Sequence, residues 1–163
     1  MKDILAELMG EWCTGVNIGG IILKICLAIV LSAVIGSERA TKRHAAGLRT
    51  FMLVSLVSAL AATVDKFLIT EYGVSIPVVT GATVIGLAIV SSNTILYSSK
   101  SQIKGLTTSV ALWGNSILSV LIGLDLYLIA LVAFAAFMLC LTGFMRFEYA
   151  LKRRSDYFEI HLE

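Results

Sequence analysis

Charged residues are scarce in this sequence, and their scarcity excludes most soluble proteins. Of the 163 residues, 58% are hydrophobic and 15% are charged, whereas a soluble domain carries about 25% charged residues. Proline occurs once, histidine twice and cysteine three times. The length permits one domain. We therefore expect a single membrane domain of the all-α class.

Catalytic motifs are also missing. The two histidines, His44 and His161, have no Ser/His/Asp, metalloprotease, P-loop or dinucleotide-binding pattern around them. Cys13, Cys26 and Cys140 have no metal or redox spacing, and two of them lie in apolar runs, where cysteine acts as a small hydrophobic residue. We expect no enzyme activity, no cofactor and no nucleic-acid partner.

Five apolar segments are each about as long as a membrane-spanning helix, which needs about 20 residues. A helix pairs its own backbone polar groups in lipid, and no segment alternates as a membrane β-barrel strand does. The last break is only Leu124–Asp125, so a tight hairpin with one shorter arm is an alternative to five full spans. The predicted spans are Ile18–Ser37, Thr50–Ile69, Pro77–Tyr97, Leu106–Leu124 and Leu126–Met145.

Lysine and arginine are unevenly distributed between the loops. Only Lys2 and Lys66 lie on one side of the predicted membrane, and Lys24 lies inside the first span. The positive-inside rule therefore places the N-terminus outside and the C-terminus in the cytoplasm, where the basic segments would contact anionic lipids. The other ten basic residues are Arg39, Lys42, Arg43, Arg49, Lys100, Lys104, Arg146, Lys152, Arg153 and Arg154.

The two ends of the chain differ from the predicted membrane domain of residues 18–150. Residues 1–17 place apolar and acidic side chains on opposite helical faces, which is typical of an amphipathic helix on the outer surface. The tail, residues 151–163, alternates apolar and polar residues from Tyr157 onward, as a strand does. One strand is not stable alone, so the tail pairs with a partner chain, begins a further domain or is disordered.

Small residues at four-residue spacing form stripes on three spans, where they let helices approach closely. Two interpretations remain open: packing within the monomer, or a homodimer interface. Trp113, inside the fourth span, is expected to be a packing residue. The stripes are Ala28, Ser32 and Gly36; Ser55, Ala59 and Thr63; and Asn115, Ser119 and Gly123.

A charge at membrane depth is costly, so each charged residue on the predicted outer side needs a partner or access to water. Lys24 either extends its stem to the outer interface or pairs with Asp65 or Asp125. Asp65 and Lys66 are expected at the interface, and Asp125 in a solvated turn.

On the predicted cytoplasmic side, Glu38 and Arg39 end the first span, and Arg49 and Thr50 begin the second. They are either interfacial anchors or a paired site, since a bidentate carboxylate–guanidinium bond offsets part of the desolvation of both groups. Gly47 favours the site, because glycine allows close approach of a backbone or a bound ion.

A second polar group accompanies this site. Asn93, with two donors and an acceptor, is expected to face the helix bundle from the end of the third span. Lys104, Gly105 and Thr108 begin the fourth span near the same surface. We group these residues with Glu38 and Arg49 as the candidate functional cluster.

Three motifs in this region resemble the MgtC/SapB family of bacterial inner-membrane proteins. Gly36-Ser37-Glu38-Arg39 is similar to the family's G-x-E-R run, and Gly47–Val54 to its G-L-R-T-x-M-L-V run. Lys104–Trp113 is similar to R-G-L-T-T-A-A-x-L-W. The third span departs from the family, because Gly86–Asn93 replaces a glycine-rich run and adds Asn93.

The resemblance implies a function without catalysis. Family members are linked to growth at low magnesium and to survival inside host cells, and one branch restrains the proton-translocating ATP synthase. The first interpretation is a regulator that contacts other membrane proteins, and the second is a transporter or channel for a cation such as magnesium with Glu38 as a ligand. An enzyme is the third and least favoured.

Overall fold

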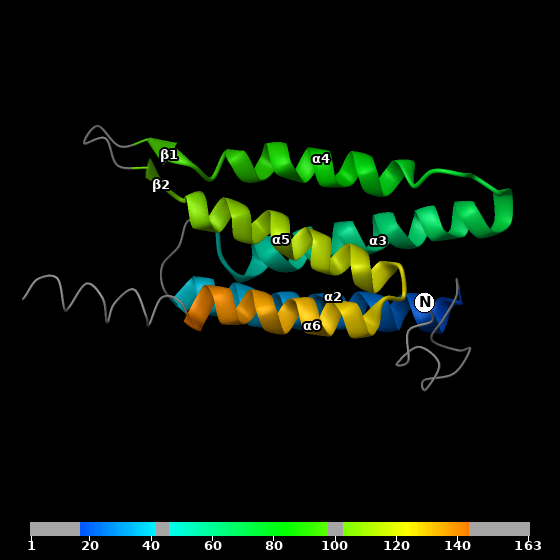
Figure 1. Ribbon diagram of the computed structural model, residues 1–163, viewed down its shortest axis with the longest axis horizontal. Coiled ribbons are helices and arrows are strands. Elements are labelled where there is room, and N and C mark those ends of the chain that lie inside the picture. The colour runs from blue at the N-terminus through cyan, green and yellow to red at the C-terminus, as the bar shows by residue number, and fades with distance from the viewer. Residues whose placement is uncertain (1–16, 42–45, 98–102, 144–163) are drawn as a thin grey trace, which may run out of the picture. The chain divides into compact units, whose positions relative to one another are not determined.

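The computed structural model describes residues 17–41, 46–97 and 103–143 (Figure 1), and these residues form five helices and one short strand pair. The all-α class and the five predicted helices are confirmed. The expected surface helix, apart from Asn17, and the tail lie outside the described residues. The elements are α2 (Ile18–Thr41), α3 (Leu48–Tyr72), α4 (Val78–Ser92), β1 (Leu96–Tyr97), β2 (Ile103–Lys104), α5 (Leu106–Gly123) and α6 (Tyr127–Met138), which continues as the π-helix η1 (Leu139–Gly143).

The helices differ in their capacity to cross a membrane. Helices α2, α3 and α5, with 24, 25 and 18 residues, are long and apolar enough to do so, whereas α4 and the continuous helix Tyr127–Gly143 are shorter apolar helices. At 1.5 Å per residue, the 15 residues of α4 span about 22 Å, less than the roughly 30 Å of a bilayer core.

The third predicted span, Pro77–Tyr97, is wrong at its C-terminal end. Helix α4 ends at Ser92, and β1 pairs antiparallel with β2, with Leu96 opposite Lys104. The hydroxyls of Ser91, Ser92 and Thr94 each donate to the carbonyl three residues before them. Such local bonds compete with the helical pattern, and the polar residues Ser91–Thr94 interrupt the apolar run where the helix ends.

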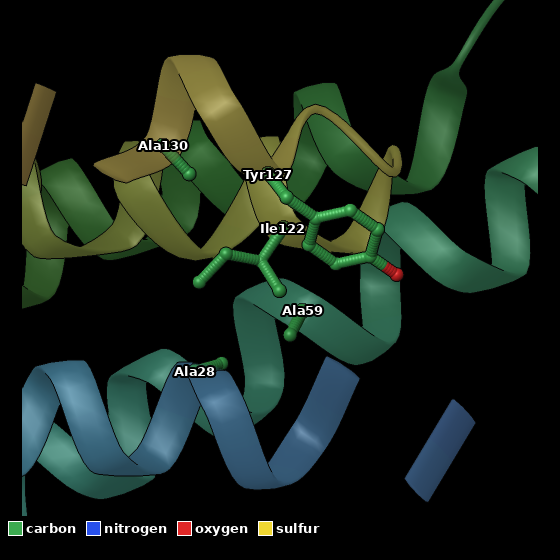
Figure 2. Close-up of a cluster of buried hydrophobic side chains, with 5 residues drawn as sticks. All are labelled: Ala28, Ala59, Ile122, Tyr127 and Ala130. Carbon is green, nitrogen blue, oxygen red and sulfur yellow. The ribbon is translucent and has the colours of Figure 1, made fainter. Parts of the chain in front are cut away.

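Residues 1–130 and 131–163 form two compact units, and the packing described below is that of the first. Helix α3 contacts α2, α4 and α5, while α5 also contacts α2 and α4. An apolar cluster joins three of these helices to the start of α6 (Figure 2). Its alanines let the backbones approach. The cluster is Ala28, Ala59, Ile122, Tyr127 and Ala130.

A tight turn joins α5 to α6, and the predicted break at Leu124–Asp125 is confirmed. Asp125 has φ 63°, the left-handed region in which aspartate is found more often than most residues. The next residue, Leu126, donates its N–H to the carbonyl of Leu121 at 2.9 Å. The turn brings the Asp125 carboxylate close to the start of α2 and the end of α3, and we call this the Asp125 end of the bundle. The Arg39 end holds the opposite ends of α2 and α3.

Candidate functional site

Three charged side chains and a tyrosine meet at the Asp125 end. Lys24 Nζ on α2 lies 2.6 Å from Asp125 Oδ1, and Lys66 Nζ on α3 forms an ion pair with Asp125 Oδ2. The hydroxyl of Tyr127 donates to Asp125 Oδ1 at 3.2 Å. We call these four residues the Asp125 cluster. It connects α2, α3 and the α5–α6 turn through a single carboxylate.

The members of the Asp125 cluster differ in exposure. The side chain of Lys24 is 0% exposed and that of Asp125 is 8% exposed, whereas that of Lys66 is 27% exposed. A buried ion needs a close partner to offset its desolvation, and both lysines have one. The cluster is therefore a buried ion pair with a second cation at its edge.

Asp65, the residue before Lys66, serves a different helix. Its Oδ1 accepts the N–H of Val79 at 3.0 Å, and its Oδ2 accepts the N–H of Thr80 at 2.5 Å. These amides belong to the first turn of α4, which has no side-chain cap of its own. A carboxylate here satisfies orphan amides and complements the positive end of the helix dipole. Asp65 thus fastens α4 to α3.

The sequence interpretation of this end was partly wrong. The structure realises one of the two alternatives for Lys24, the ion pair with Asp125. The expected solvated position of Asp125 is wrong, because the turn folds back onto the bundle and the residue is 7% exposed. Asp65 is buried as well, at 2% exposed, rather than interfacial. No sequence motif indicated these contacts; the only signal was that Lys24 needed a partner at its depth.

A polar seam runs along the contacts between α2, α3 and α5. Asn115 Nδ2 donates to Ser32 Oγ at 3.2 Å and to the Phe51 carbonyl at 3.1 Å. Two serine pairs lie at hydrogen-bond distance across α3 and α5, at 2.7 and 2.9 Å. These bonds hold the helices together in the absence of water. The seam consists of Ser32, Ser55, Ser58, Asn115, Ser116 and Ser119, all buried.

The small-residue stripes pack within the chain. A Cβ added at Gly123 would lie 2.7 Å from the Ala59 carbonyl oxygen, and one at Gly36 would lie 2.9 Å from Leu48 Cα. The structure thus uses the stripes for packing inside one chain, the first of the two interpretations, and the homodimer stays a prediction. The stripe residues, all buried, are Ala28, Ser32, Gly36, Ser55, Ala59, Thr63, Asn115, Ser119 and Gly123.

The Arg39 end holds the family-like motif residues, but the structure separates them. Arg39 is fully buried, and its Nε lies 3.4 Å from Glu38 Oε2. Arg49 and Thr50 are exposed on the first turn of α3, whereas the next residue, Phe51, is buried. Gly47 is the N-cap of α3. Glu38 and Arg39 thus form an ion pair within α2, and the paired site that would join the ends of α2 and α3 stays a prediction.

The residues of the second polar group also differ in their surroundings. The expectation that Asn93 faces the bundle is wrong, because α4 ends just before it and leaves it exposed. Gly105 has φ 90° at the N-cap of α5, and a Cβ there would collide with the Thr94 carbonyl. Thr108 is buried, and the side chain of Lys104 lies outside the described part of the structure. Trp113 is 41% exposed, and its packing role stays a prediction.

Metal ligands are sparse in the part of the chain that the structure describes. No group of three or more histidine, cysteine, aspartate or glutamate residues there could hold a metal ion. Asp65 and Asp125, the two buried acids of the described bundle, have amide and ammonium partners. The two acids therefore offset buried positive charge and hold the ends of helices in place.

Comparison with known proteins adds a family. A model of the MgtC family matches residues 25–150. Protein SrpB of Synechococcus elongatus is 29% identical over 152 residues, which cover 85% of this chain and 79% of SrpB. An Escherichia coli protein named "Putative magnesium transporter YhiD" is 25% identical over 147 residues, covering 86% of this chain and 68% of its own. No solved structure matches the chain.

Proposed function

This chain belongs to the MgtC family, and we propose that it is a non-enzymatic regulator that acts on other membrane proteins through helix contacts. Its setting is the bacterial inner membrane, with the N-terminus outside, because ten of the thirteen basic residues would then lie in the cytoplasm. Its role is in adaptation to low magnesium or stress and, in a pathogen, virulence. The proton-translocating ATP synthase is one target that the family resemblance implies.

The state of the buried acids carries this proposal. A pathway for Mg²⁺ needs carboxylate or carbonyl oxygens that are available to the ion. Asp125 has an ammonium group on each of its two oxygens, and Asp65 has a backbone amide on each of its own. An entering cation would have to displace these partners and would meet two lysines.

The alternative function is transport of a cation such as magnesium. It is favoured by the name of the E. coli relative and by the position of Glu38, which is partly buried at the Arg39 end. Against it, the Arg39 guanidinium lies beside this carboxylate and repels a cation.

Flux into proteoliposomes separates the two functions. The purified chain is reconstituted at known orientation, and Mg²⁺ uptake is followed with an enclosed fluorescent indicator. We expect uptake equal to that of protein-free vesicles. Saturable uptake that is lost in Glu38→Gln and kept in Glu71→Gln, an exposed acid of α3, would contradict the regulator.

Self-association is a part of this proposal, and we assign it to α4. Only Thr80 and Ser91 of this helix are buried, and its length of about 22 Å is short for the bilayer core. A short span is accommodated by thinning the bilayer or by oligomerising. A single cysteine at Ala82, in a chain whose native cysteines are replaced by serine, should crosslink two copies. A cysteine at the buried Ala59 is the control, and equal crosslinking at both positions would contradict the assignment.

A further inference from the structure

We propose that the exposed edge of the Asp125 cluster is a binding site for a phosphate group, with Lys66 as its principal ligand. The phosphate belongs either to an anionic lipid headgroup or to free inorganic phosphate, and both present the same oxygens to an ammonium group. This inference does not depend on the regulatory function proposed above.

The first support is the spare hydrogen-bonding capacity of Lys66. An ammonium group carries three donors, and Asp125 is the acceptor that the structure gives it. The Lys66 side chain is 27% exposed, so further donors can reach an incoming group. The Lys24 side chain, in contrast, is 0% exposed, so it contributes its positive charge from inside the bundle.

The second support is the ratio of charges. Two ammonium groups share the Asp125 carboxylate, and Asp65, the residue before Lys66, is directed to the amides of α4. Because Lys24 and Lys66 repel one another across this carboxylate, an anion beside Lys66 reduces that repulsion. The cluster therefore attracts an anion rather than a cation.

The third support is position. Lys66 lies six residues before the end of α3, about 9 Å along the helix axis, a depth from which a lysine reaches the headgroup region. Phe67 and Tyr72 contact each other edge to face, with ring centroids 6.0 Å apart, on the same stretch of α3. Aromatic side chains are typical of this boundary, so a headgroup phosphate and Lys66 occupy the same layer.

The experiment measures thermal unfolding of the full chain in neutral detergent during three titrations. The probes are phosphatidylglycerol, phosphatidylcholine and sodium phosphate, the last against sodium chloride at equal ionic strength. We expect phosphatidylglycerol to raise the unfolding temperature saturably. Its half-saturation concentration should rise about fivefold in Lys66→Gln, the factor that corresponds to one lysine at a membrane surface. Lys66→Arg should retain native affinity.

The controls assign each outcome. Lys152→Gln removes one positive charge outside the described residues and should raise the half-saturation concentration much less than Lys66→Gln does. A Lys66-dependent response to sodium phosphate identifies the free anion as the ligand, and a response to phosphatidylglycerol alone identifies the lipid. Equal responses of the native chain and Lys66→Gln to every probe would overturn the proposal, and so would equal responses to phosphatidylglycerol and phosphatidylcholine together with no Lys66-dependent response to sodium phosphate. Lys24 still pairs with Asp125 in Lys66→Gln, so this variant is expected to fold.

Discussion

The two ends of the bundle use charge differently. At the Asp125 end, one carboxylate joins α2, α3 and the α5–α6 turn, and Asp65, the residue before Lys66, fastens α4. At the Arg39 end, the ion pair Glu38–Arg39 lies within one helix, and Arg49 is exposed. The ion pairs described between different helices thus lie at the Asp125 end, whereas the family-like motifs include the exposed Arg49.

The difference has a consequence for function. Residues that hold the fold are expected to change stability when substituted, whereas an exposed motif residue is expected to change contacts with a partner. We therefore assign stability mainly to the Asp125 end and function mainly to the exposed part of the Arg39 end.

Removing the Asp125 carboxylate should lower the free energy of unfolding more than any other single substitution proposed for the two ends. Asp125→Ala leaves two ammonium groups without it, and loss of one partner of a buried pair costs about 3–5 kcal/mol. We expect the free energy of unfolding, measured by SDS titration in lipid–detergent micelles, to fall by about this amount. Lys66→Gln, which retains the Lys24–Asp125 pair, should lose much less. Equal losses would show that the cluster does not depend on its carboxylate.

Filling the closest helix contact should have the next largest effect. Gly123→Ala places a Cβ 2.6 Å from Ala62 Cβ and 2.7 Å from a backbone carbonyl of α3, and overpacking of this kind costs about 1–3 kcal/mol. The same SDS titration gives the loss. Gly81→Ala is the matched control, because a Cβ there meets nothing within 4 Å. A loss in Gly81→Ala as large as in Gly123→Ala would contradict the packing argument.

Removing the distant cap of α4 should have a smaller effect. Asp65→Ala leaves the amides of Val79 and Thr80 without their acceptor, and loss of a helix N-cap costs about 0.5–2 kcal/mol. Hydrogen exchange of the α4 amides should rise while that of α5 stays slow. Unchanged exchange in α4 would mean that Asp65 does not fasten this helix.

Substituting the exposed motif arginine should affect stability least. Arg49→Ala is expected to change the free energy of unfolding by less than about 0.5 kcal/mol, as surface substitutions do. At equal expression, we expect it to reduce growth at low magnesium more than Arg153→Ala, a tail residue. Equal growth of the two variants would remove the functional assignment of the Arg39 end.

Local patterns in the sequence predicted the helices better than the site. Apolar runs are continuous, so the positions of α2, α3 and α5 follow from hydrophobicity alone. The end of α4 does not, because the apolar residues Ile95–Tyr97 beyond the polar stretch Ser91–Thr94 extend the predicted span past the end of the helix. The Lys24–Asp125 pair joins residues 101 positions apart in the numbering, and no local pattern encodes such a contact. The motif residues were recognisable, but their spacing did not reveal that Arg49 is exposed.

The most direct test of the account is a double-mutant cycle on Lys24 and Asp125. The free energy of unfolding is measured for the native chain, Lys24→Gln, Asp125→Asn and the double variant, with and without Mg²⁺. If the carboxylate is an internal counter-charge, the coupling energy should exceed about 1.5 kcal/mol, as for close charge pairs shielded from water, and Mg²⁺ should not change it. A coupling energy below about 0.5 kcal/mol, typical of exposed pairs, or one that Mg²⁺ abolishes, would contradict this role.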